Sequence, residues 1–140
     1  MVLPIRRTGT ADAQIDVSPC GGISKKRTGT LANSQTSINM IWEIRVPAQN
    51  ANCTVKISPG LDNETNFKTI FPIDGSADTK GEFPCGRIQG FDTKQFKLPE
   101  NYVCDQCTLQ WKWMTPKGDF YSCSDITING QTSTKSDNFS

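Results

Sequence analysis

Polar and apolar residues alternate along much of this chain, and a period of two is the pattern of half-buried β-strands. The longest example runs from Ile38 to Val46, where every second residue is apolar and only Ile41 interrupts the polar positions between them. We expect a strand over this run that ends at Pro47, because proline has no backbone N–H to donate to a neighbouring strand.

Two shorter runs alternate in the same way and end at turn-forming residues. Residues 54–57 precede the pair Pro59-Gly60, and residues 67–73 precede Asp74-Gly75. Each is predicted to be a short strand. The alternating positions of the second are Phe67, Thr69, Phe71 and Ile73.

A hairpin is predicted near the C-terminus. Its first strand has Leu109, Trp111 and Trp113 on one face, and residues 116–119 (PKGD) turn the chain into a second strand over residues 120–128. The alternation places these tryptophans, and Trp42, in the core. No stretch shows the uninterrupted apolar period of an amphipathic helix.

Short strands at frequent turns predict an all-β fold, a disulfide-stapled antiparallel β-sandwich of immunoglobulin or fibronectin type. The chain has 140 residues, about the size of one domain. We expect a polar arm or edge strand at residues 1–19, the sandwich at residues 20–129 and a polar tail at residues 130–140.

Six cysteines form an even set, which is typical of extracellular disulfide-linked domains. We expect three disulfides; Cys20 with Cys123 would close the two ends of the domain, and the sequence leaves the connectivity open. The spacing of Cys104 and Cys107 also occurs in zinc knuckles and redox motifs, but a second pair at this spacing is missing and a strand, not a helix, is predicted after it. The six are Cys20, Cys53, Cys85, Cys104, Cys107 and Cys123.

Three sequons for N-glycosylation, at Asn52, Asn63 and Asn138, agree with passage through a secretory pathway. Asn63 lies in a polar turn and is the preferred glycan site. The apolar run at residues 1–5 is too short for a signal peptide, so we expect that a leader was removed, and no run is long enough for a membrane span. The protein is expected to be secreted or located at a cell surface.

Charge and composition narrow the classes of function. Lys and Arg number 15 and Asp and Glu 14, and the net charge of +1 offers no field for a nucleic-acid backbone. The chain has no histidine, the residue most used for proton transfer and metal binding at neutral pH. A nucleic-acid partner and most hydrolase or metalloenzyme chemistry are therefore disfavoured.

Residues 104–113 (CDQCTLQWKW), followed by residues 121–126 (YSCSDI), resemble the C-terminal hairpin of lytic polysaccharide monooxygenases and of chitin-binding proteins with that fold. Residues 19–22 (PCGG) and 81–83 (GEF), with Cys85, are similar to segments of small fungal copper-binding proteins related to them. The resemblance covers about residues 19–128. It implies an immunoglobulin-like sandwich in which a Cys20–Cys123 disulfide would be natural.

The resemblance also implies copper, but the ligands for it are missing. The enzymes hold copper through an N-terminal histidine and a second histidine, the copper-binding relatives also begin with histidine, and this sequence has none. Core packing explains Met1, Met40 and Met114 better than copper binding does. We therefore predict no metal site and no cofactor.

General acid and base catalysis is also unsupported. The carboxylate pairs Asp119 with Asp125 and Asp62 with Glu64 are expected to be solvated turn residues, because no apolar pocket is predicted beside them. We predict no catalytic residue and no enzymatic activity.

The first functional hypothesis is a non-catalytic module that binds polysaccharide or glycan. Exposed aromatic rings pack against sugar faces in such modules. The candidates near strand ends are Tyr102, Phe120 and Tyr121, with Phe91 and Phe96 in a loop.

The alternative is a structural protomer of an extracellular filament, matrix or surface coat, which binds copies of itself. Its N-terminal arm would add a strand to the sheet of a neighbour, with Val2, Leu3 and Ile5 as anchors.

Overall fold

The computed structural model describes residues 20, 30–32, 37–59, 67–99, 102 and 104–128. Strands, turns and loops make up these residues, and none of them belongs to a helix that could span a membrane. The strands are β1 (Thr30–Ala32), β2 (Ser37–Ile44), β3 (Asn52–Ser58), β4 (Lys68–Pro72), β5 (Phe83–Pro84), β6 (Gly90–Lys97), β7 (Cys104–Thr115) and β8 (Gly118–Ile128).

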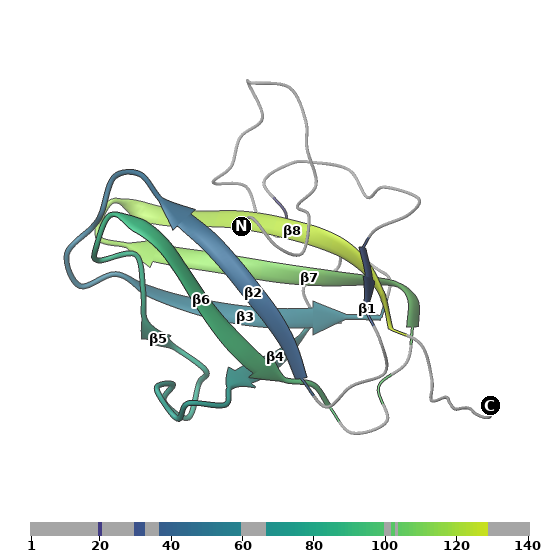
Figure 1. Cartoon of the computed structure of the whole chain (residues 1–140). Helices are drawn as coiled ribbons and strands as arrows, with labels where there is room; N and C mark the ends of the chain where they lie inside the picture. The colour runs from purple at the N-terminus through teal and green to yellow at the C-terminus, as the bar shows by residue number, and fades with distance from the viewer. Residues whose placement is uncertain are drawn as a thin grey trace, which may run out of the picture.

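The strands follow one another in the order β1-β8-β7-β3-β4-β6-β2, with β5 beside β3. β4 begins next to β3 and ends next to β6, so it carries the hydrogen-bonded path from one layer to the other. Figure 1 shows β2 and β6 crossing in front of β3, β7 and β8. Of the pairs formed by these strands only β1 with β8 is parallel, and the predicted antiparallel β-sandwich is confirmed.

The core lies between the two layers and is rich in aromatic side chains. Trp42 of β2 is fully buried, and its ring centroid lies 5.9 Å from that of Trp111 in β7. The rings of Phe83 and Phe96 also pack on Trp42, with distances between ring centroids of 6.1 and 6.5 Å. Trp113 stacks on Trp111 at 6.2 Å and is half-buried at the rim of the core. The prediction that the side chains of the three tryptophans face the core is therefore confirmed.

The structure contains three disulfides: Cys20–Cys123, Cys53–Cys85 and Cys104–Cys107. The second ties the segment after β5 to the central strand β3. The zinc interpretation of the Cys104–Cys107 spacing is wrong, because both sulfur atoms are committed to a disulfide.

The phase of β4 differs from the sequence prediction. Ile70 and Pro72 are buried, whereas Phe71 and Ile73 are 42% and 56% exposed. Because side chains alternate between faces, a shift of one residue exchanges the inner and outer sets. The inner and outer residues differ from the prediction because β4 pairs with β3 up to Ile70 and with β6 from Phe71 onward. The partner of Phe71 is Lys97, and both side chains lie on the outside of the sandwich.

Two boundaries also differ. β2 ends at Ile44, and Val46, expected on the apolar face, is 75% exposed. Phe91 and Phe96 were expected in a loop, but both belong to strand β6. Phe96 is its only fully buried side chain, so the strand carries too few apolar residues to show a period of two.

Candidate binding surface

β2 and β6 pair along their full lengths and turn one set of side chains to solvent. The buried Trp42 and Phe96 point into the core, so the odd-numbered residues of both strands point outward. Residues that are direct partners lie on the same side, as Glu43 and Phe91 do. We name this surface the β2–β6 outer face; it consists of Ser37, Asn39, Ile41, Glu43, Phe91, Thr93, Gln95 and Lys97, with Phe71 of β4 at its edge.

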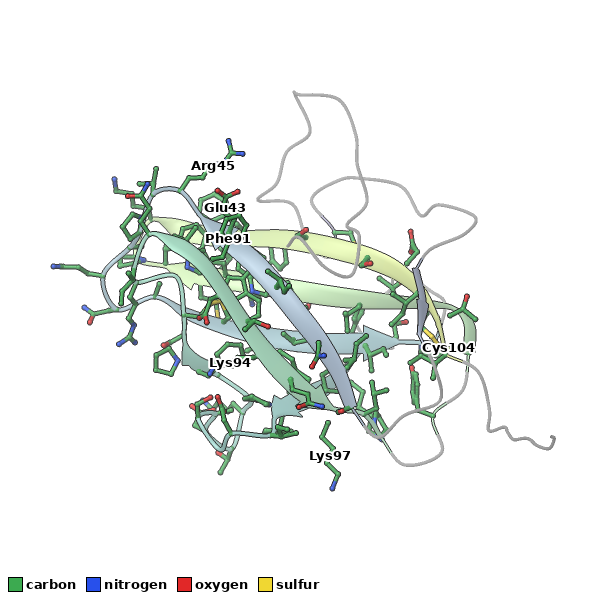
Figure 2. All side chains as sticks on the ribbon, viewed as in Figure 1. Glu43, Arg45, Phe91, Lys94, Lys97 and Cys104 are labelled. Atoms are coloured by element: carbon green, nitrogen blue, oxygen red, sulfur yellow. A yellow bond between two sulfur atoms is a disulfide. The ribbon has the colours of Figure 1, made fainter. Side chains whose placement is uncertain are left out.

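Two phenylalanine rings stand at opposite ends of this face. Phe91 is 70% exposed near the start of β6, and Phe71 lies beside Lys97 near its end. The strand between Phe91 and Lys97 spans about 20 Å at the usual rise of a β-strand. Figure 2 shows Phe91 with Glu43 at one end of the β2–β6 pair and Lys97 at the other. Exposed rings on neighbouring strands form a surface suited to an extended ligand with apolar faces.

The polar side chains between the rings are held in place by hydrogen bonds. Thr93 donates its hydroxyl to the carbonyl oxygen of Met40 at 3.0 Å. Gln95 donates from Nε2 to Oγ of Ser37 at 2.5 Å. These bonds order the face before any ligand arrives, which lowers the entropic cost of binding.

A cavity of about 350 Å³ adjoins the Phe91 end of the face, and we name it the Arg87 cavity. Arg87 donates from Nε to the carbonyl oxygen of Ala51 at 2.8 Å and from Nη2 to Oδ1 of Asn52 at 2.9 Å. Asn52 is the first residue of β3 and Ala51 directly precedes it, so these hydrogen bonds hold the guanidinium group against the start of the central strand. The cavity is lined by Ile44, Pro84, Cys85, Gly86, Arg87, Ile88, Gln89, Phe91 and Asp92.

Gly86 fixes the wall of this cavity. Its φ is +73°, and a Cβ atom at this position would overlap the indole of Trp113. Its carbonyl oxygen accepts a hydrogen bond from the amide of Ala48 at 2.9 Å. A side chain is therefore excluded here both by backbone conformation and by space.

Lys94 lies on the inner side of β6 and adds no free charge to the outer face. Its ammonium group is 2.5 Å from Oδ2 of Asp74 and 5.6 Å from the centroid of the Phe83 ring. The hydrogen bond from Lys94, with two from Ser76, holds the pKa of Asp74 well below its usual range. The cation of Lys94 is thus neutralised by a neighbouring carboxylate.

The structure does not gather the three predicted glycan-binding aromatic residues on one surface. Tyr102 is half-buried against the core with its hydroxyl buried, and burial raises the pKa of that hydroxyl. Phe120 packs on Trp113 at 5.7 Å. Tyr121 points to the opposite side of β8, where the ammonium group of Lys112 lies 5.6 Å from its ring.

Of the two aromatic residues expected in the loop, Phe96 is fully buried and Phe91 is exposed.

The predicted glycosylation and assembly residues are only partly within the described chain. Asn52 is half-buried in β3 and its side chain binds Arg87. The remaining predicted residues of these two groups lie outside the described residues, so they stay predictions: Asn63, Asn138, Val2, Leu3 and Ile5.

The candidate catalytic and copper residues are dispersed. Asp125 is buried in β8, so its description as a solvated turn residue is wrong. Asp119 lies 3.7 Å from the ammonium group of Lys112. Met40 is fully buried in the core and Met114 is half-buried in β7. Asp62, Glu64 and Met1 lie outside the described residues.

Sequence reasoning missed Phe71 and most residues of the Arg87 cavity. Residues 85–92 show no alternation, so no pattern in the sequence indicates that Arg87, Gln89 and Asp92 lie together. One signal was present: Ile88 and Phe91 are large apolar residues among polar ones near Gly86 and Gly90. Apolar residues in such a segment are a reason to look for a ligand surface.

The sandwich, with its hairpin of β7 and β8 and its disulfides, has the fold of lytic polysaccharide monooxygenases. An AA15 lytic polysaccharide monooxygenase from Thermobia domestica, determined in the Cu(I) state, matches with a TM-score of 0.65 and 20% identity over 74% of this chain and 64% of its own. A cellulose-active polysaccharide monooxygenase from M. thermophila matches with a TM-score of 0.57 and 13% identity over 84% of this chain and 60% of its own. The chain thus spans less than two thirds of either protein. No protein-family profile and no curated protein matches it.

The comparison confirms the resemblance at the level of the fold. It contradicts the expectation that the protein is not an enzyme, because the two matching structures described above are both enzymes. We withdraw that expectation. A fold shared at this identity does not itself assign a reaction.

The residues present do not fit the copper site that the fold family implies. That site needs histidine, and the chain has none. All six cysteines are in disulfides, and the described residues contain no group of three or more side chains suited to hold a metal ion. We derive no chemical step through copper.

Proposed function

We propose that this protein binds polysaccharide along the β2–β6 outer face, outside the cell. The observation that carries the proposal is the pair of exposed rings, Phe91 and Phe71, at the two ends of an ordered polar strand surface. Two proteins of similar fold are named as polysaccharide monooxygenases, one of them cellulose-active. The three disulfides suit an oxidising extracellular compartment.

The chemistry of the face suits a sugar chain. A pyranose ring has an apolar face that packs on an aromatic ring and a rim of hydroxyl groups that exchange hydrogen bonds with amides and hydroxyls. Phe91 and Phe71 supply the rings, while Asn39 and Gln95 lie between them. A chain that spans the face would contact both rings at once.

A depletion assay on insoluble cellulose and chitin tests the proposal. Phe91→Ala and Phe71→Ala should each weaken binding about 2- to 10-fold, because each removes one aromatic contact. Tyr121→Ala is the matched control, since Tyr121 lies on β8 and not on the β2–β6 outer face. The proposal fails if neither polymer binds, if both phenylalanine variants bind like the wild type, or if Tyr121→Ala causes the larger loss.

A further inference from the structure

We infer that the Arg87 cavity binds the carboxylate of an acidic sugar unit. This inference rests on the function proposed above and names the class of polysaccharide that the β2–β6 outer face would hold. Phe91 belongs to both surfaces, so a chain on the face has one of its units at the mouth of the cavity.

The first argument is the unneutralised charge of Arg87. Its two hydrogen bonds go to a backbone carbonyl oxygen and to an amide oxygen, both of which are uncharged. No ion pair within 4.0 Å joins Arg87 to a described carboxylate, whereas Arg45 pairs with Glu43 and Lys94 with Asp74. A guanidinium group has five N–H donors, so further donors remain for a ligand.

The second argument is rigidity. The acceptor on Asn52 lies at the first residue of the central strand and that on Ala51 directly before it, and the Cys53–Cys85 disulfide restrains the chain just before Arg87. The planar fork of a guanidinium group matches a carboxylate, and holding it in advance reduces the cost of ordering it on binding.

The third argument is the rest of the lining. The apolar side chains of Ile44, Pro84 and Ile88 line part of the cavity wall and offer no polar group that competes with Arg87 for the ligand. The volume of about 350 Å³ suits a small ligand group. Asp92, whose Oδ1 accepts the amide of Thr93 at 2.9 Å, faces the same cavity as an acceptor for hydroxyl groups.

The test is affinity electrophoresis in gels that contain one soluble polymer each: polygalacturonate, neutral hydroxyethyl cellulose or dextran sulfate. At low salt the wild type should bind polygalacturonate about tenfold more tightly than the neutral polymer. Arg87→Gln should lose this preference while its binding to hydroxyethyl cellulose is unchanged, and Arg87→Lys should keep part of it. Arg45→Gln, which alters an exposed arginine already paired with Glu43, should keep all of it.

The outcomes separate this inference from the proposed function. A preference that survives in Arg87→Gln, or dextran sulfate bound more tightly than polygalacturonate, would overturn the assignment of a carboxylate. Binding that is weakened about 2- to 10-fold in Phe91→Ala, together with loss of the preference in Arg87→Gln, supports both statements. If Phe91→Ala and Phe71→Ala both change nothing on any polymer while Arg87→Gln loses the preference, the carboxylate site is supported and the proposed function of the outer face fails. Circular dichroism of each variant confirms that it is folded.

Discussion

Gly86 lines the Arg87 cavity at a position where a side chain does not fit. Its positive φ and its contact with the Trp113 indole both require glycine, whereas Gly75 has a similar φ of +77° with open space around it. Gly86→Ala should lower the free energy of unfolding by about 2–4 kcal/mol and Gly75→Ala by about 1–2 kcal/mol, because only the former adds a clash to the backbone strain. Urea denaturation measures both, and equal losses would show that Trp113 moves aside without cost.

Asp74 and Lys94 form the charged contact whose effect depends on pH. The pKa of Asp74 is lower in the folded than in the unfolded protein, so the contact stabilises the fold above the unfolded pKa of about 3.9 and this stability is lost as the pH falls through the folded value. The side chain of Asp74 is 48% exposed, so solvent weakens the effect.

We expect Asp74→Asn to lower Tm by about 1–4 °C at pH 7. The difference from the wild type should persist down to about pH 4 and narrow only in stronger acid. The same substitution in a Lys94→Met background should have a smaller effect. Thermal melts across this range measure the difference, and a difference that grows in acid would contradict the assignment.

At the scale of elements, two disulfides restrain loops of very different length. Cys53–Cys85 closes a separation of 32 residues and joins β3 to the segment that carries Arg87, whereas Cys104–Cys107 closes a separation of 3 at the irregular start of β7. In the chain-entropy description a longer loop gives the larger stabilisation.

Replacing Cys53 and Cys85 by serine should cost about 3–4 kcal/mol, against about 1–2 kcal/mol for Cys104 and Cys107. Chemical denaturation of the two double variants checks this order. The reverse order would mean that packing at the start of β7, not loop closure, sets the contribution.

The elements also show how far the sequence could predict this fold. β2, β3 and β7 follow from the alternation of their apolar residues, and β8 follows from the turn at residues 116–119 that precedes it. β4 was found with the wrong phase, because Phe71 and Ile73 are apolar yet exposed. β6 was missed, because only one of its inward side chains is apolar and fully buried. β4 and β6, which were hardest to predict, supply both exposed phenylalanine rings of the proposed binding surface.

At the scale of the molecule, the fold was predictable and the candidate site was not. Strand pattern, cysteines and the resemblance of residues 104–113 agreed on a sandwich. The site depends on tertiary placement: β4 reaches β6 at Phe71, and residues 85–92 return to the start of β3, where Arg87 meets Asn52. No local pattern encodes either contact. A phenylalanine is tolerated on the solvent-facing side of a strand, so the sequence alone does not distinguish Phe71 and Phe91 from the phenylalanines of the core.

The most direct test of polysaccharide binding at the β2–β6 outer face is a map of amide chemical shifts during titration with a soluble oligosaccharide. We expect shifts for residues 39–43, 71 and 91–97 that saturate together. Shifts confined to Tyr102, Phe120 and Tyr121, or none at any oligosaccharide concentration, would contradict the account.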